Sequence, residues 1–309
     1  MIMKMKAIAR NIAGVLATGY ILMFFSEHLF WAHVRPGDSL AGWLMTWLVY
    51  SLLGYAFLTL VSRFQARTIW AVFLCGAAFG WLAEGLVVQT AYENLPLSIS
   101  FTGLAWHAAI SVLVGWRMMR RALQAGFKQT LWLSIMIGVL NGLWAISWWN
   151  EPGERITPIV EFALYALITQ GLVILAYWIE SRTIRGTRKP NRPVEFAVGL
   201  IALLYFVFVT IPAAPKATWI LPALLLIVFF TLRRNRTNEG KEISLYSQVD
   251  QPPFLNYLGL WAIPFAAILV YALAAAAGLR WHTNWVFYLV TTPLGFVLLM
   301  AALYKIWRK

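Results

Sequence analysis

Three polar residues, Glu84, His107 and Asn141, lie inside long apolar stretches of the sequence. Ionisable groups at membrane depth are costly, and they commonly mark a functional site or a polar partner. A carboxylate beside an imidazole can hold one shared proton, which suits a general acid or base and equally suits a proton-coupled carrier. We expect Glu84 and His107 to be catalytic, with Asn141 in substrate binding.

Small residues recur around these polar groups at helical spacing. Residues four apart share one face of a helix, and a Gly-x-x-x-Gly spacing lets two helices approach closely. Each polar group is therefore expected to face other helices instead of lipid. The rows are Gly76-Gly80-Glu84 and Gly103-His107-Ser111-Gly115, and Asn141 is flanked by Gly138, Gly142 and Ala145.

A second set of polar residues lies nearer the predicted outer ends of the helices. Glu27, His28 and Glu161 should lie about 5–7 Å below the outer surface, whereas the first three polar residues should lie about 12 Å below it. Together they predict a polar cavity that opens outward, with Glu84, His107 and Asn141 at its floor. The expected substrate-binding residues are Asn141, Glu27, His28, Glu161, Tyr92 and Trp106. The rim of the cavity should be formed by Tyr92, Glu93, Asn150, Glu151 and Glu154.

The composition indicates what kind of chain positions these residues. Of the 309 residues, 61% are hydrophobic and 12% are charged, and the mean hydropathy is +0.70. Soluble domains carry about 25% charged residues, so the composition predicts an all-α integral membrane protein. The single cysteine, Cys75, can form no internal disulfide, and no zinc-type Cys/His spacing is present. We therefore expect no metal and no other cofactor.

Ten apolar stretches are long enough to cross a bilayer, which needs about 20 helical residues. If the amino terminus lies inside, all but four of the 25 Lys and Arg residues fall on the inner side; the exceptions are Arg35, Arg155, Lys216 and Arg280. Cytoplasmic loops are rich in Lys and Arg, so both termini are predicted to be cytoplasmic. The net charge of +13 then faces anionic lipids, and no nucleic-acid partner is expected. The predicted spans are 8–31, 40–61, 69–91, 98–116, 131–149, 158–179, 194–213, 216–232, 256–279 and 284–306.

Two polar linkers suggest how the chain is organised. Residues 1–180 are predicted to form a six-helix unit with the polar cavity, and residues 194–309 a mostly apolar four-helix unit with a cytoplasmic loop at 233–256. The seventh and eighth spans form either a tight hairpin or one broken element. The basic start and the apolar run after it are expected to be an uncleaved first helix in the cell (inner or plasma) membrane. Membrane lipids are the expected partners, and the oligomeric state is left open.

Two short patterns are similar to those of known membrane enzymes. The run from Ala83 to Thr90, followed by Pro96 and then Gly103-Leu104-Ala105-Trp106, resembles the glutamate-bearing segment of membrane carotenoid-biosynthesis hydratases. The order Glu, His, Asn on successive spans is similar to that of the CAAX-protease-like intramembrane proteases. The first family's Gly- and Tyr-rich loop is missing here, as are the second family's adjacent glutamates and second histidine. We therefore assign the chain to neither family.

Three functions are compatible with these residues. The first is an intramembrane enzyme that acts on a lipid-like substrate from the extracytoplasmic side, with Glu84 as general acid or base and His107 orienting it. The second is a proton- or cation-coupled carrier of a small solute. The third is a structural or accessory membrane subunit in which the polar pairs only join helices.

Overall fold

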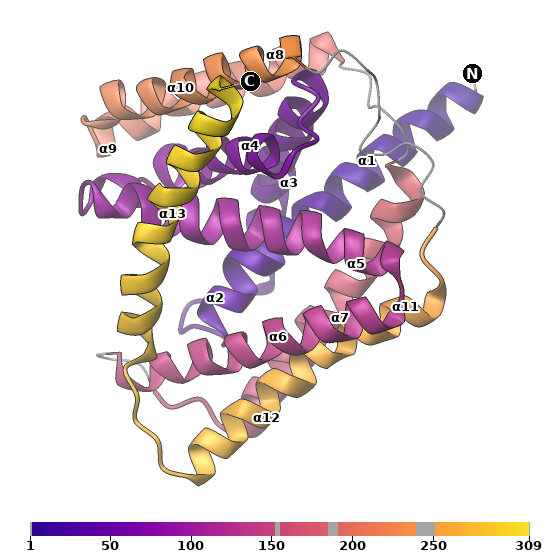
Figure 1. The fold of residues 1–309 in the computed structure, drawn as a ribbon, viewed down its shortest axis with the longest axis vertical. Coiled ribbons are helices and arrows are strands. Elements are labelled where there is room, and N and C mark those ends of the chain that lie inside the picture. Colours follow the sequence, from indigo (N-terminus) through magenta and orange to yellow (C-terminus); the bar gives the residue numbers. More distant parts are fainter. Residues whose placement is uncertain (1, 152–154, 185–190, 239–250, 309) are drawn as a thin grey trace. The chain divides into compact units, whose positions relative to one another are not determined.

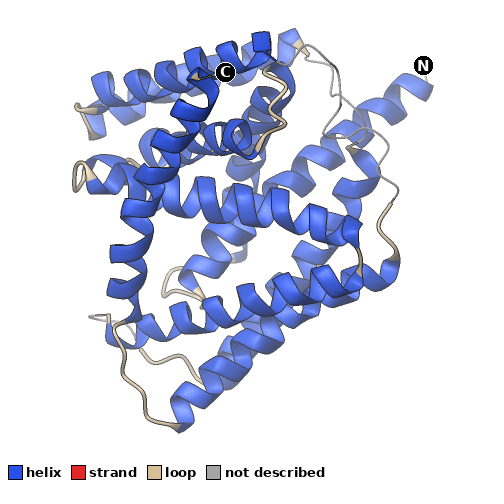
Figure 2. Ribbon diagram, in the orientation of Figure 1, coloured by secondary structure: helices blue, strands red, loops and turns tan. Residues whose placement is uncertain are grey.

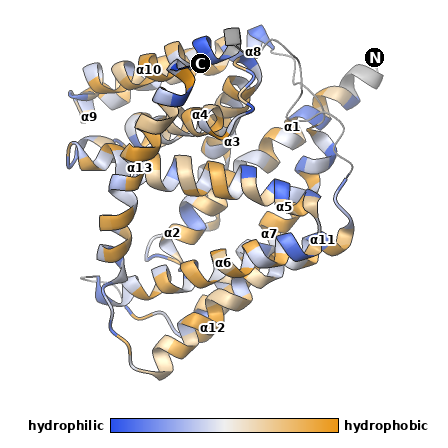
Figure 3. Cartoon of the chain, in the orientation of Figure 1, coloured by the Kyte–Doolittle hydropathy of each residue, from blue (hydrophilic) through white to orange (hydrophobic). Residues whose placement is uncertain are grey.

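The computed structural model describes residues 2–151, 155–184, 191–238 and 251–308. Over these residues the regular secondary structure is helical and contains no strand (Figure 2). Ten helical segments within them are long and apolar enough to cross a membrane, which confirms the predicted fold class of an all-α multi-pass membrane protein. The helices are apolar over most of their length (Figure 3). The cytoplasmic location of both termini stays a prediction.

The candidate spans lie close to the predicted ones. The third is shorter than predicted because the helix ends at Val87 and Gln89 adopts a left-handed conformation with a φ of 63°. The seventh and eighth are two separate helices, so the single broken element is excluded. Within the described residues the spans are Lys6–Trp31, Leu40–Arg63, Ile69–Val87, Ile99–Ala125, Phe127–Asn150, Ile159–Thr183, Arg192–Ala213, Ala217–Asn235, Phe254–Ala276 and Thr283–Trp307. Glu154 and half of the predicted loop at 233–256, residues 239–250, lie outside the described residues.

Contacts along the chain divide it into two compact units, each built from three stretches. Unit 1 comprises Met1–Tyr50, Gly115–Thr183 and Val249–Val290, and unit 2 comprises Ser51–Val114, Ile184–Gln248 and Thr291–Lys309. Each unit therefore combines stretches from both sides of the linker predicted near residues 180–194. The predicted division into 1–180 and 194–309 rests on polar content and stays a prediction.

Unit 1 is organised around two pairs of helices that pack side by side (Figure 1). Helix α1 (Ile2–Met23) packs along α7 (Ile159–Thr183), and α6 (Phe127–Ala145) packs along α12 (Ala262–Ala276). The second pair packs closely because Gly138 has no side chain at the contact. A Cβ added there would lie 2.3 Å from the carbonyl oxygen of Ile263. The stacked rings of Phe162 and Tyr271, 4.2 Å apart, fill the core beside this pair.

Unit 2 is organised around a close contact between two helical segments. Helix α4 (Ile69–Trp81) continues into a π-helical turn, η2 (Leu82–Val87), and faces residues 99–114 of a longer π-helical segment, η4 (Ile99–Met118). A Cβ added at Gly80 would lie 2.2 Å from the carbonyl oxygen of Gly103. Substitution with any larger residue would therefore push the two backbones apart.

Side chains from the seventh span satisfy the carbonyl groups at the end of η2. The hydroxyl of Thr210, at the end of the π-helical turn η6 (Phe206–Thr210), donates to Leu86 O at 2.7 Å. The hydroxyl of Tyr205, the last residue of α8 (Arg192–Tyr205), donates to Val87 O at 3.2 Å. A helix end leaves its last carbonyls without partners, so these two hydroxyls fix the segment that carries Glu84.

Candidate functional site

Glu84 and His107 form a direct carboxylate–imidazole pair in unit 2. Glu84 lies on η2 and His107 on η4, and His107 Nε2 is 2.7 Å from Glu84 Oε1. The hydroxyl of Thr90 donates to Glu84 Oε2. The side chains are 13% and 3% exposed, respectively, so the pair is nearly shielded from water. A hydrogen bond in such a setting is stronger than one in water.

Closely packed groups surround this pair. A Cβ added at Gly80 would lie 2.8 Å from the Cβ of His107, and the Phe79 ring meets the imidazole edge-on at a centroid distance of 5.5 Å. Trp81 Nε1 donates to Ile99 O at 3.1 Å and ties the two segments together. The arrangement fits an acid–base pair, and it equally fits an interhelical hydrogen bond.

Two further residues predicted for substrate binding, Tyr92 and Trp106, are buried in unit 2. The hydroxyl of Tyr92 donates to Gly85 O at 2.9 Å, and burial raises the pKa of Tyr92 to about 12. Tyr92 therefore stabilises the end of η2 as a neutral phenol. Its role, and that of Trp106, in substrate binding stays a prediction.

Asn141 lies in unit 1 and binds the end of the first helical span. Its side-chain amide donates to Leu29 O at 3.0 Å, and Trp148 Nε1 donates to Phe30 O at 2.9 Å. These carbonyls belong to the last turn of the helix, where intrahelical partners are missing. Asn141 therefore caps a helix in unit 1, while Glu84 and His107 pair within unit 2. The predicted cavity floor formed by all three stays a prediction.

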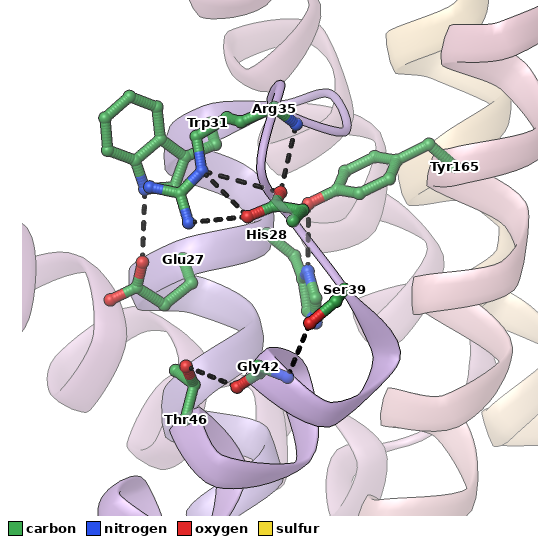
Figure 4. A network of polar contacts seen from close by, with 9 residues as sticks. Glu27, His28, Trp31, Arg35, Ser39, Gly42, Thr46 and Tyr165 are labelled. Atoms are coloured by element: carbon green, nitrogen blue, oxygen red, sulfur yellow. Dashed lines mark hydrogen bonds and ion pairs between the residues drawn. The ribbon is translucent and has the colours of Figure 1, made fainter.

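Glu27 and His28 belong to a polar network in unit 1 (Figure 4). Glu27 Oε1 accepts a hydrogen bond from Tyr50 OH at 2.6 Å. Glu27 Oε2 accepts one from Trp31 Nε1 at 3.1 Å. His28 Nδ1 lies 2.9 Å from Tyr165 OH on α7. Both side chains are thus held by groups that sequence reasoning did not connect with them.

The imidazole of His28 is enclosed by four aromatic rings. The ring centroids of Tyr20, Phe24, Trp43 and Tyr165 lie between 5.6 and 6.2 Å from that of His28. His28 lies on a π-helical turn, η1 (Phe24–His28). π-Helical turns are rare in proteins, and those that occur are often found at functional sites. Glu84 and His107 also lie on π-helical segments.

Two ion pairs lie near the ends of helices in unit 1. Arg35 Nη2 is 2.9 Å from Asp38 Oδ1, and Arg155 Nη2 is 2.5 Å from Glu161 Oε1. Burial opposes the ionisation of Asp38, but its hydrogen bonds with Arg35 and the Arg35 charge outweigh burial and hold the pKa of Asp38 below its ordinary value. Glu161 was predicted to bind substrate, and the structure gives it an exposed arginine partner.

An apolar groove of about 380 Å³ runs between α1, α7 and the first turns of α3 (Leu40–Arg63). On α1 and its continuation it extends from Ala13 to His28, about 22 Å at 1.5 Å per residue. Its volume lies in the range of about 300–1,000 Å³ found for small-molecule sites. The lining residues are Ala13, Leu16, Ala17, Tyr20, Met23, His28, Leu40, Trp43, Leu44, Trp47, Ile168, Thr169, Leu172, Leu175, Ala176 and Ile179.

Sequence reasoning missed a buried carboxylate, Glu180, at the other end of α7. Its Oε1 accepts hydrogen bonds from Thr18 at 2.9 Å and Trp116 at 2.8 Å, and Arg120 Nε is 3.0 Å from its Oε2. The sequence places Glu180 at the start of a basic linker, which is typical of an exposed residue. In the sequence, Glu180 is a single carboxylate followed by several arginines, and this pattern does not predict that its side chain is buried.

Among the described residues, no group of three or more His, Cys, Asp or Glu side chains could hold a metal ion. Comparison of the chain with protein-family models, with curated proteins and with solved structures found no match. The ten candidate spans therefore define the class of the protein, a multi-pass helical membrane protein, and the function must be argued from the site.

Proposed function

We propose that this chain is an intramembrane enzyme that binds a lipid-like substrate in the groove of unit 1 and acts on its polar end by acid–base chemistry. The observation that carries the proposal is that an apolar groove of about 380 Å³ ends at a buried imidazole, His28. A polar ligand would lose its hydrogen bonds in such a groove. A hydrocarbon chain loses none, so an acyl or isoprenoid chain fits the lining best.

His28 is the proposed acid–base group. Imidazole is the side chain that most often transfers protons in enzymes, and the Tyr165 hydroxyl at 2.9 Å fixes the orientation of this ring. The four aromatic rings around it exclude water from most of its surface. Under the predicted topology this end of the groove faces the extracytoplasmic side, where the polar end of an outer-leaflet lipid would lie.

The pair of Glu84 and His107 supports a second candidate function. A carboxylate 2.7 Å from an imidazole can carry one shared proton, so the pair could serve as the proton site of a coupled carrier. It could also be the acid–base group of the enzyme, as the sequence predicts. The groove favours His28, because it offers a substrate a route to that residue.

Lipid binding tests the proposal first. Purified protein should retain a chain-bearing lipid that native mass spectrometry detects, and Leu44→Trp should reduce the bound fraction by filling the groove. Leu48→Trp is the matched control, since Leu48 lies one turn further along α3, is 49% exposed against 48% for Leu44, and does not line the groove. Equal loss in both variants, or no bound lipid in the wild type, would refute the groove as a substrate site.

Three variants distinguish the acid–base groups. Once the retained lipid is identified, its conversion by the wild type is compared with that by His28→Asn, Glu84→Gln and His107→Ala. General acid–base catalysis contributes about 10²–10⁴-fold, so His28→Asn should lower kcat by at least about 10²-fold with the lipid still bound. A loss of activity only in Glu84→Gln and His107→Ala would move the chemistry to unit 2. Proton-coupled uptake in liposomes, abolished by Glu84→Gln, would instead establish the carrier.

A further inference from the structure

A second and much smaller cavity is also lined by His28. It has a volume of about 10 Å³ and lies between the end of the first span, α6, α7 and α12. That volume is about what a single water molecule needs. Its lining residues include five with polar side chains, His28, Asn141, Tyr165, Thr169 and Gln170. A cavity lined in this way can offer a bound water the polar partners that it requires.

Gln170 supplies an independent sign of a ligand in this cavity. Its side chain is fully buried, and its Nε2 donates to Leu260 O at 3.0 Å. Its Oε1 is buried and has no hydrogen-bond partner among the residues that the structure describes. Buried polar atoms almost always have a partner, and ordered water is a common one. An acceptor in a water-sized cavity therefore points to a water molecule that donates to it.

His28 connects this cavity with the groove, because its imidazole lines both. One ring nitrogen, Nδ1, is engaged by Tyr165. His28 thus borders both a polar cavity for one water and an apolar groove for one hydrocarbon chain. A general base that contacts both a water molecule and the polar end of a bound substrate can take a proton from the water as the water attacks.

We propose that the small cavity binds one water molecule through Gln170 Oε1, and that this water is the second reactant, so that the enzyme hydrolyses a lipid ester. The water oxygen bonds to the ester carbonyl carbon while His28 takes one of its protons. The bond from that carbon to the alcohol oxygen then breaks, and the alcohol oxygen receives the proton from His28. One water and one ester give one carboxylic acid and one alcohol.

The groove lining favours a carboxylic ester over a phosphate ester. Enzymes that transfer phosphoryl groups stabilise the added negative charge with Lys, Arg or a metal ion. The described lining of the groove contains no Lys or Arg. The reaction class rests on the proposed function, whereas the binding of water at Gln170 does not.

The test uses the full-length protein in detergent and long-chain p-nitrophenyl esters as the probe. In H₂¹⁸O, the wild type should release a fatty acid that carries ¹⁸O. Gln170→Leu should lower kcat by about tenfold, the effect of one lost hydrogen bond, with KM unchanged. Thr130→Val is the control, because Thr130 is also buried in unit 1 but lines neither cavity, and its hydroxyl donates to Gly126 O within its own turn.

The outcomes separate this inference from the proposed function. A wild type that retains lipid in the groove but releases no ¹⁸O-labelled acid overturns hydrolysis and leaves the lipid-binding enzyme standing. A wild type that retains no lipid overturns the proposed function as well. If Gln170→Leu does not fold, a high-resolution structure of the wild type decides the water site: density within hydrogen-bond distance of Gln170 Oε1 supports it, and its absence overturns it.

Discussion

Replacement of Glu180 by glutamine should destabilise unit 1 far more than the loss of a carboxylate from an exposed ion pair. Glu180 is 1% exposed, and its two oxygens together accept from Thr18, Trp116 and Arg120. Glutamine keeps one acceptor oxygen for Thr18 and Trp116. Its amide group, however, would place an N–H donor against the donors of the Arg120 guanidinium, and the charge of Arg120 would no longer face the Glu180 carboxylate.

The expected cost follows from the burial of both partners. Removal of one member of a buried ion pair costs about 3–5 kcal/mol. Arg120 is 16% exposed and stays over the Trp116 ring at 4.6 Å, so some of that cost is recovered through hydration. We therefore expect Glu180→Gln to lower the free energy of unfolding by about 2–4 kcal/mol.

The assay is reversible unfolding in mixed micelles, followed by tryptophan fluorescence. Glu161→Gln is the matched control, because Glu161 lies on the same helix and also pairs with an arginine, but the two side chains are 33% and 64% exposed. An exposed pair contributes less than about 1 kcal/mol. A double-mutant cycle with Arg120→Gln should give a coupling of about 1–3 kcal/mol. Equal costs for Glu180→Gln and Glu161→Gln, or strictly additive effects in the cycle, would refute the reasoning.

Three further predictions concern other parts of the chain. Gly80→Ala should destabilise unit 2 by about 1–3 kcal/mol, since the added Cβ would lie 2.2 Å from Gly103 O. A Cβ added at Gly199 on α8 would have no atom within 4 Å, so Gly199→Ala should be neutral or stabilising. Equal shifts in the melting temperatures of the two variants would contradict this reasoning. The pKa of Asp38 is lower in the folded protein than its unfolded value near 3.8, so ionised Asp38 stabilises the fold above that pH. This stabilisation is lost as the pH falls through the lower folded pKa. Asp38→Asn should therefore reduce the loss of unfolding free energy that is measured as the pH is lowered through this range. Cys75 is fully buried, so a maleimide should label it only upon unfolding; rapid labelling of the native protein would show that α4 is not packed as described.

The sequence alone determined the fold class and nearly all of the spans. Hydrophobicity and length are properties of a continuous stretch of residues, so they need no knowledge of partners. The same holds for the inward faces of α4 and η4, since Gly76, Gly80, Glu84 and His107 follow helical spacing. Spacing placed Glu84 and His107 each on an inward face, but their contact at 2.7 Å depends on the packing of the two segments.

Only the tertiary structure decided which groups hold each polar side chain. Glu180 accepts from Thr18, 162 residues away, and His28 contacts Tyr165, 137 residues away. No local pattern encodes such pairings, because they depend on which helices become neighbours. The groove likewise needs α1, α3 and α7 together. The left-handed residue Gln89 and the π-helical turns at His28 and Glu84 also escaped prediction, because they adjust the backbone to contacts that exist only in the folded chain.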